Sequence, residues 1–168
     1  MITINHKKHI DIENFFIMSM GDWLTQKTSY NPNTKTHKTK TTKTSVTKIQ
    51  THDVPTSKSI KNENVYRITS QQNNAEASSI ITYNYEDNVP SKGFINKTDN
   101  NNKNGAIKGI FNLSEGVLKI LIEKEPLTIE QTVWFINNNL KLTKSITRKD
   151  KHCVLISFIS EIKIKSDK

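Results

Sequence analysis

The side chains best suited to bind or activate another molecule lie in and just beyond the segment Gln131–Lys144, which reads QTVWFINNNLKLTK. A β-prone run is interrupted by three asparagines, and an alternating run then resumes, which predicts two strands joined by a turn. Successive side chains of a strand point to opposite faces, so Leu140 and Leu142 share one face. The opposite face carries a lysine and two hydroxyl groups, namely Lys141, Thr143 and Ser145. This polar face either meets water or lines a polar pocket, and the functional interpretation depends on which.

A carboxylate in the last apolar segment is a second candidate. Glu161 stands between Ser160 and Ile162 in a long β-prone run. A carboxylate that points inward needs a cationic partner, and Lys141 or Lys27 could supply it. A Glu161 that faces solvent is the alternative.

Other reactive groups are sparse. Cys153 is the only cysteine, so no intramolecular disulfide can form, and we expect an inert small side chain there. The histidines show no metal-ligand spacing, and no glycine-rich phosphate loop or nucleophile elbow occurs. We therefore expect neither a metal site nor a cofactor of the protein's own.

The formal net charge is +9 at pH 7 and the sequence pI is about 9.6. Such a surface attracts nucleic acid, anionic lipid, an acidic protein or a carboxylate ligand, although A/T-rich codons also favour lysine, asparagine and isoleucine. The Thr/Lys-rich stretch Thr34–Gln50 predicts a mobile basic segment at about 31–45 and a strand that ends near Val46–Ile49. It lacks interleaved aromatic residues, which weakens a nucleic-acid interpretation. No apolar run approaches the roughly 20 residues of a membrane span.

The elements that must position these residues are mostly strands. A short helix is predicted at about 11–20, with Asp11 as N-cap and Gly21 as the stop. Trp23 begins the first strand. Further strands are predicted at Ile60–Ser70, Ala77–Glu86, Lys92–Thr98, Ala106–Leu113, Gly116–Lys124, Leu127–Ile136, Leu140–Thr147 and Val154–Lys165.

Short connections between these strands favour antiparallel pairing, because parallel pairing needs crossovers of about a dozen residues. A sheet of about ten strands tends to close, and a closed barrel of that size has room for one small ligand. The expected fold class is mainly β: a lipocalin-like, antiparallel up-and-down β-barrel with a short N-terminal α-helix. We expect residues 1–168 to form a single domain.

Both ends of the chain resemble one protein family. Near the C-terminus Trp134-Phe135, Asn139-Leu140 and Ser145 are followed by Ser157-Phe158 and Ser160-Glu161-Ile162. Near the N-terminus Phe15-Phe16 precedes the run Trp23-Leu24-Thr25-Gln26-Lys27-Thr28. In this order, and without a gap in the C-terminal part, these residues resemble the S-type phycobiliprotein chromophore lyases, the CpcS/CpeS family.

The resemblance implies a ten-stranded lipocalin-like barrel that binds an open-chain tetrapyrrole, phycocyanobilin or phycoerythrobilin, as substrate. It implies delivery of this bilin to a cysteine of an apo-phycobiliprotein subunit, with the attacking thiol supplied by the acceptor. A homodimer or a heteromeric lyase partner is also implied, with neither nucleic acid nor membrane as partner. The implied location is the stroma of a red-algal or cryptophyte plastid, or otherwise a cyanobacterial cytoplasm.

The resemblance also assigns candidate residues. Family arginines are replaced by Lys27, Lys141 and Thr143, and a family glutamate is replaced by Gln131, with Glu130 beside it. Lysine offers a carboxylate a point charge where arginine offers a planar fork. The candidates for catalysis are Gln131, Glu130 and Glu161. The candidates for bilin binding are Lys27, Tyr83, Tyr85, Gln131, Trp134, Lys141, Thr143 and Ser145.

Two other functions remain open at this point. One is a carrier of a bilin or another amphipathic carboxylate that performs no transfer, or a subunit of a heteromeric lyase. The other is a basic barrel that binds RNA or an acidic protein surface through Thr34–Lys48.

Overall fold

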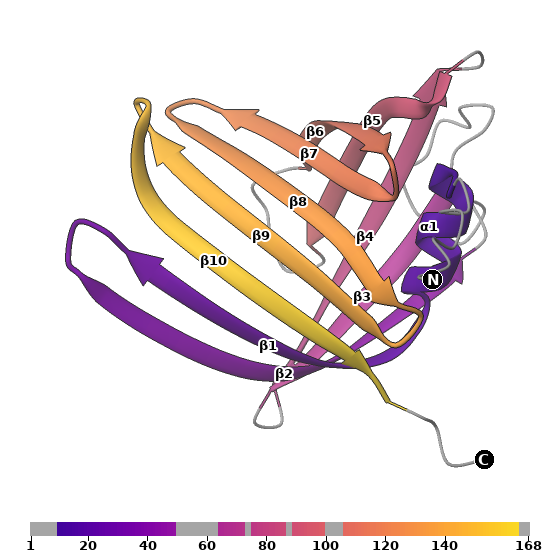
Figure 1. Ribbon diagram of the computed structural model, residues 1–168, viewed down its shortest axis with the longest axis horizontal. Coiled ribbons are helices and arrows are strands. Elements are labelled where there is room, and N and C mark those ends of the chain that lie inside the picture. Colours follow the sequence, from indigo (N-terminus) through magenta and orange to yellow (C-terminus); the bar gives the residue numbers. More distant parts are fainter. Residues whose placement is uncertain (1–9, 50–63, 73–74, 87–88, 100–105, 165–168) are drawn as a thin grey trace, which may run out of the picture.

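The computed structural model describes residues 10–49, 64–72, 75–86, 89–99 and 106–164, and every structural statement below concerns these residues. They form one closed barrel in which each strand pairs with its sequence neighbour and β1 pairs with β10 (Figure 1). All ten pairings are antiparallel, which confirms the predicted up-and-down barrel. The strands are β1 Gly21–Asn31, β2 Thr36–Ile49, β3 Asn64–Gln72, β4 Ala75–Glu86, β5 Val89–Asp99, β6 Ile107–Ser114, β7 Val117–Lys124, β8 Leu127–Asn137, β9 Leu140–Lys149 and β10 His152–Lys163.

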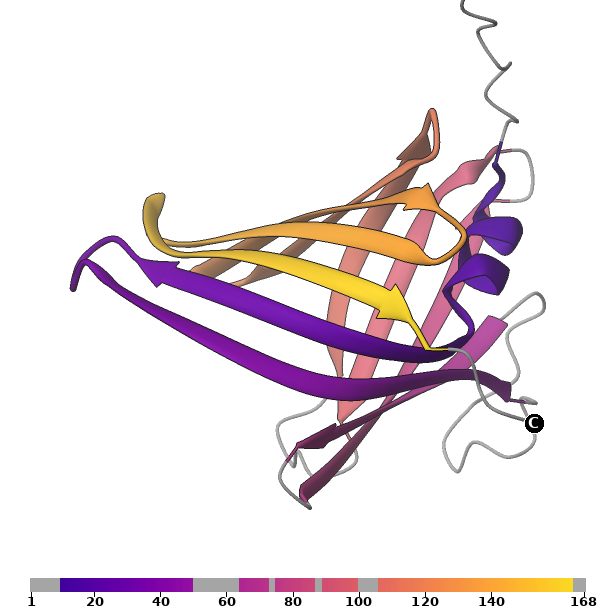
Figure 2. The same cartoon turned by 60° about the horizontal axis from the view of Figure 1, so that its bottom comes forward.

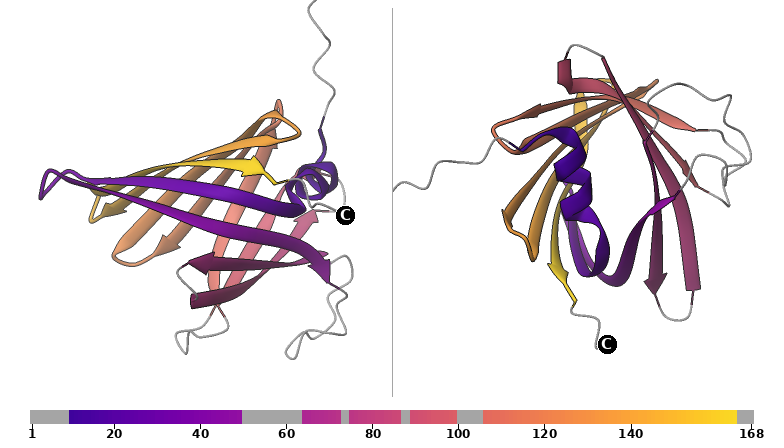
Figure 3. Two further views of the ribbon diagram at one scale, coloured as in Figure 1. Left: turned by 90° about the horizontal axis from the view of Figure 1, so that it is seen from below. Right: turned by 90° about the vertical axis from the view of Figure 1, so that its right-hand side faces the viewer.

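The helix α1, Ile12–Ser19, covers one end of the barrel (Figure 3, right). It begins as predicted at Asp11, whose carboxylate accepts a hydrogen bond from the backbone N–H of Asn14 at 2.7 Å. It ends before Gly21, which has a φ of +109° that other residues rarely adopt. Eight residues are too few for a stable isolated helix, so α1 depends on the apolar side chains that it buries in the barrel.

Aromatic rings join α1 to the barrel wall. Phe16 stacks on Tyr83, with ring centroids 4.3 Å apart, and on Tyr66, with centroids 5.2 Å apart. Phe15 meets Phe135 edge to face at 5.1 Å. The hydrophobic core is therefore concentrated at the α1 end of the barrel.

The prediction of a mobile segment at about 31–45 is wrong from Thr36 onward, where the structure has a strand. A four-residue turn at 32–35 follows β1, and β2 then runs without interruption from Thr36 to Ile49. The side chain of Asn31 stabilises the turn by accepting hydrogen bonds from the N–H groups of Asn33 and Thr34. β2 is ordered by its neighbours, because it pairs with β1 along its N-terminal part and with β3 along its C-terminal part.

The two ends of the barrel differ. The β1–β2 and β9–β10 hairpins extend away from the end that carries α1 (Figures 1 and 2). Core side chains and the helix close one end, whereas at the other end side chains on the inner side of the hairpins are exposed, as for Lys27 and Lys40.

Candidate functional site

The polar face of β9 points into the barrel. Lys141, Thr143 and Ser145 retain only 8%, 7% and 9% of their surface exposure. Leu140 and Leu142 alternate with them and lie half-buried on the outer face. The polar face therefore points into the barrel and not to bulk water, and the leucines are not part of the inner core.

The inward-facing side chains of β8, β9, β10, β1 and β2 form what we call the inner wall. Cross-strand register aligns them in three rows, since residues directly opposite each other share a face. From the α1 end outward, the rows are Phe135–Lys141–Glu161–Thr25–Thr42, then Val133–Thr143–Ile159–Lys27–Lys40, then Gln131–Ser145–Ser157–Ser29–Lys38.

A buried ion pair lies in the first row. The Nζ atom of Lys141 is 3.0 Å from a carboxylate oxygen of Glu161, and each side chain is about nine-tenths buried. The hydroxyl of Thr25 lies 3.5 Å from the other Glu161 oxygen and 3.0 Å from the hydroxyl of Thr44. The structure thus pairs Glu161 with one of the two expected lysines, and Lys141 is already neutralised in the free protein.

Trp23 supports this ion pair from the α1 side. The Nζ of Lys141 lies 5.0 Å from the centre of its ring, and the Nζ of Lys163 lies 4.9 Å from it. Lys163 also donates a hydrogen bond to the carbonyl of Met18 near the end of α1. Burial lowers the pKa of Lys163, and the charge of Lys141 lowers it further. Lys163 was not among the candidate site residues, although its period-two spacing from Glu161 places both on one face.

The third row is rich in hydroxyl groups. The hydroxyls of Ser29 and Ser157 are 2.8 Å apart, and Ser145 lies directly opposite Ser157. Gln131 lies opposite Ser145 and is half-buried. This row offers donors and acceptors without a net charge, except at its β2 end.

Lys27 occupies the second row, opposite Ile159 on β10 and Lys40 on β2. It faces inward like Thr143 but is exposed, so solvent reaches the inner wall at this point. The structure therefore brings six predicted residues onto one surface: Lys27, Gln131, Lys141, Thr143, Ser145 and Glu161.

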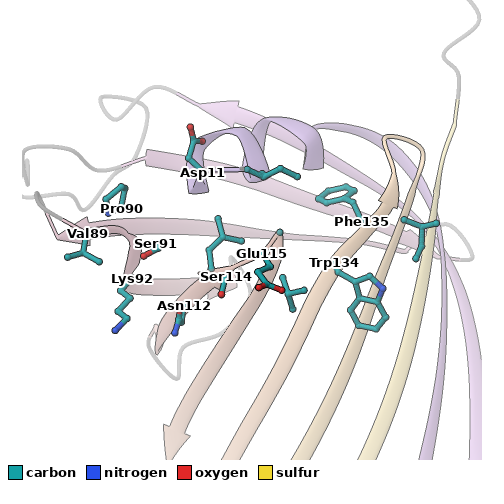
Figure 4. Close-up of a pocket in the computed structure, with 15 residues that line it drawn as sticks. Asp11, Val89, Pro90, Ser91, Lys92, Asn112, Ser114, Glu115, Trp134 and Phe135 are labelled. Carbon is teal, nitrogen blue, oxygen red and sulfur yellow. The ribbon is translucent and has the colours of Figure 1, made fainter. Parts of the chain in front are cut away.

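Two predicted residues lie on the opposite side of the sheet. Glu130 faces outward, where its carboxylate accepts a hydrogen bond from Arg148 at 2.6 Å. Trp134 lies opposite Leu142 and Val117 on the outer face, and it points away from α1 whereas Phe135 points toward it (Figure 4). The alternation of strand residues explains both cases. On β8, Glu130 precedes the inward-facing Gln131, and Trp134 precedes the inward-facing Phe135. Contact of Glu130 or Trp134 with a ligand on the inner wall does not fit this geometry.

The predicted tyrosines are divided between core and wall. Tyr83 is fully buried beneath Phe16, so packing already accounts for it. Burial raises the pKa of Tyr83, and the adjacent Tyr66 raises it further. The hydroxyls of both have no hydrogen-bond partner among the described residues. Tyr85 shares the inward face of Tyr83 and is half-buried opposite Gly93, where a Cβ atom would collide with the backbone of β4.

A separate cavity of about 1200 Å³ opens at the α1 end (Figure 4). It lies between the start of α1, the start of β5, the β6–β7 turn and the end of β8, and its lining includes Asp11, Lys92, Glu115 and Trp134. Phe135 is the only inner-wall residue that lines it. The cavity and the exposed part of the inner wall are thus two distinct places where a ligand could bind.

Within the described ranges, no three histidine, cysteine or acidic side chains are grouped so as to hold a metal ion. In the same part of the chain, no helix is long and apolar enough to cross a membrane.

A family model described as CpeS-like protein matches residues 11–164, which is nearly the whole barrel with its helix. The chain belongs to the CpeS-like protein family. The predicted family resemblance is thereby confirmed.

Curated relatives of this CpeS-like protein match over a shorter stretch. It is 51% identical over 37 residues to a chromophore lyase CpcS/CpeS homolog of Pyropia yezoensis, and 49% identical over 37 residues to the corresponding homolog of Porphyra purpurea. Each alignment covers 22% of this chain and 25% of the relative. The matched segment therefore spans a quarter of the length of these relatives.

Solved structures share the fold over a longer stretch. The S-type phycobiliprotein lyase CpeS of Guillardia theta superposes with a TM-score of 0.72 at 17% identity, covering 96% of this chain and 97% of that one. A protein of unknown function from the DUF3598 family of Nostoc punctiforme superposes with a TM-score of 0.56 at 11% identity, covering 89% of this chain and 49% of that one. The first superposition confirms the lipocalin-like barrel.

Proposed function

We propose that this CpeS-like protein binds an open-chain tetrapyrrole on its inner wall and transfers it to a cysteine of a phycobiliprotein subunit. The observation that carries the proposal is the run of inward polar side chains along β9, from the Lys141–Glu161 pair through Thr143 to the third row, which we call the serine row. Family membership and the names of the chromophore lyase homologs supply the ligand class. A tetrapyrrole has an apolar conjugated body, pyrrole N–H donors and two carboxylates, and the wall offers partners for each.

The proposed transfer needs no nucleophile from the barrel. The acceptor thiol adds across the exocyclic ethylidene double bond, so that a C–S bond forms, the π bond breaks and the thiol proton goes to carbon of the tetrapyrrole. The addition requires no oxidant and releases no leaving group. The barrel contributes by holding the ligand in one geometry and by excluding side reactions.

Individual wall residues have distinct tasks in this proposal. The amide of Gln131 and the hydroxyls of Thr143 and Ser145 accept hydrogen bonds from pyrrole N–H groups. Glu161 holds Lys141 in place through their ion pair, which fixes the positions of two opposite charges in the first row, nearest α1. Tyr85 offers a half-buried ring for contact with the ligand's apolar body.

The second candidate function is a bilin carrier, or one subunit of a heteromeric lyase. It is favoured by the charge of the wall, because Gln131 is neutral and Lys141 is occupied by Glu161. The part of the wall formed by β8, β9 and β10 therefore carries little free charge, and it would hold a ligand without polarising it.

The test combines purified protein with phycocyanobilin or phycoerythrobilin and then adds an apo-phycobiliprotein β-subunit. After acid denaturation, the absorbance that stays with the subunit measures covalent transfer. We expect a single covalent product with the protein and slower, mixed addition without it. The double variant S145A/S157A changes the serine row and should lower the yield, whereas K119Q on the outer face of β7 serves as a control. Reversible binding without transfer would support the carrier, and no spectral change with either bilin would overturn both functions.

A further inference from the structure

Three lysines lie on the inward side of the β1–β2 hairpin, at the edge of the inner wall. Lys27 on β1 is directly opposite Lys40 on β2, and Lys38 is directly opposite Ser29. All three are exposed, and the same register places Lys43 on the outer face of β2. The basic stretch recognised in the sequence is therefore not a single outer patch, because two of its lysines face the barrel interior.

The charge of these lysines is not balanced locally. None of the hydrogen bonds or ion pairs formed within the described residues involves Lys27, Lys38 or Lys40. Among the described inner-wall residues of β8, β9, β10, β1 and β2, Glu161 is the one carboxylate, and it is 3.0 Å from Lys141. Like charges directly opposite each other on one face destabilise a strand pair. An anion placed between Lys27 and Lys40 would turn this repulsion into attraction.

The position of the lysines restricts the kind of anion. They flank the hydroxyl groups of Ser29 and Ser157 and lie on the inward side of the hairpin, which a ligand inside the barrel reaches more directly than a partner on the outer surface does. A small ligand whose body lies along the wall can reach them with short carboxylate arms. A lysine ammonium donates up to three hydrogen bonds, so three lysines suffice for two carboxylates.

We infer that Lys27, Lys38 and Lys40 form the carboxylate-binding site of the barrel, and that Lys141 has a structural role in its pair with Glu161. The identity of the ligand rests on the proposed function, under which the two carboxylates are those of the tetrapyrrole. The ligand is thereby oriented with its carboxylates toward the β1–β2 hairpin and the remainder along the serine row.

Absorbance titrations with phycocyanobilin and with its dimethyl ester test the inference. We expect K27Q, K38Q and K40Q each to weaken binding of the diacid by about 10-fold, the low end of the effect of losing one charge-assisted hydrogen bond, because these lysines are exposed. The control K43Q removes an exposed lysine of the same strand from the outer face and should leave affinity unchanged. The ester should bind the unaltered protein more weakly than the diacid does, and it should bind all four variants as well as it binds the unaltered protein.

Two results would overturn the inference. One is equal binding of diacid and ester by the unaltered protein. The other is an equal loss with K43Q and K38Q, together with competition by single-stranded RNA that falls steeply with salt, because this pattern marks an outer basic patch.

Failure of the proposed function would look different. If neither bilin nor its ester binds, the tetrapyrrole assignment is wrong, and the lysine site is then judged with laurate against lauramide. A thermal shift that laurate gives and lauramide does not, and that K27Q and K40Q abolish but K43Q retains, would support the site. The absence of such a shift would overturn it.

Discussion

The Lys141–Glu161 pair is the central feature of the wall at the scale of single residues. Two buried charges in contact offset each other's desolvation, but a buried charge that loses its partner is strongly unfavourable. The pair therefore stabilises the fold only while both charges are present. A variant that keeps the stability must change both residues or neither. The same reasoning separates it from the exposed pair of Glu130 and Arg148, which resembles it only in composition.

Replacing Glu161 by Gln should lower the free energy of unfolding by about 3–5 kcal/mol, because Lys141 then stays buried without a counter-charge. The double variant K141M/E161M should recover most of this loss. Urea unfolding measures both. E130Q is the matched control at the exposed pair and should cost about 0–1 kcal/mol. Equal losses for E161Q and E130Q would show that the inner pair is solvated.

Lys163 gives the pH dependence of stability at the same scale. Its pKa is lowered in the fold, chiefly by burial. At pH values between this lowered pKa and the unfolded value of about 10.4, the unfolded chain therefore binds more protons than the folded one. Stability contributed at this position therefore rises with pH through that interval. We expect the difference in free energy of unfolding, unaltered protein minus K163Q, to increase between pH 7 and 10. Parallel pH profiles for the two proteins would contradict the shift.

At the scale of elements, α1 and the aromatic cluster beneath it hold one end of the barrel closed. The helix has only eight residues, so few side chains attach it to the barrel. The aromatic rings at this contact are Phe15, Phe16, Tyr66, Tyr83 and Phe135. Strand β8 is also tied to the helix through Phe135. The position of the first row of the wall is consequently set by how α1 packs.

Replacing Phe16 by Ala should cost about 3–5 kcal/mol of unfolding free energy, because it opens a cavity between α1 and the two tyrosines. Thermal and urea unfolding followed by circular dichroism measure the loss. I17A, at an exposed position of the same helix, controls for the change in helix propensity. A loss with F16A no larger than that with I17A would mean that α1 is not docked as described.

The elements also show what the sequence alone could predict. Period-two alternation was sufficient to place Lys141, Thr143 and Ser145 on one face, and Asp11 and Gly21 marked the helix ends. The alternation predicts shared faces but not which face points inward, so Trp134 and Glu130 were grouped with the wall although they lie outside it. β2 was missed over 36–45 because its order comes from pairing with β1, joined by β3 from Lys43 onward, and not from apolar residues of its own.

The whole molecule has a closed end and an open end, and the two candidate binding places lie at opposite ends. The cavity of about 1200 Å³ adjoins α1, whereas Lys27, Lys38 and Lys40 lie on the hairpin that extends away from it. Local opening takes least energy where few apolar contacts cross between elements, so the two ends should also differ in amide exchange. The charge of +9 draws an anionic ligand to the molecule, but it does not decide which end receives it.

Hydrogen exchange with and without ligand decides between the ends. In the free protein, we expect amides in the outer half of the β1–β2 hairpin to exchange faster than those of β8 beside Phe135. Ligand at about 100 times its Kd adds about 2.7 kcal/mol to the free energy of global unfolding. This uniform effect slows every amide that exchanges through global unfolding. Beyond this uniform effect, bilin bound to the inner wall should slow local exchange around Lys27 and Lys40 and leave the β6–β7 turn unchanged. Additional protection confined to the β6–β7 turn and the start of β5 would instead place the ligand in the cavity at the α1 end, and the lysines would then be unrelated to its binding.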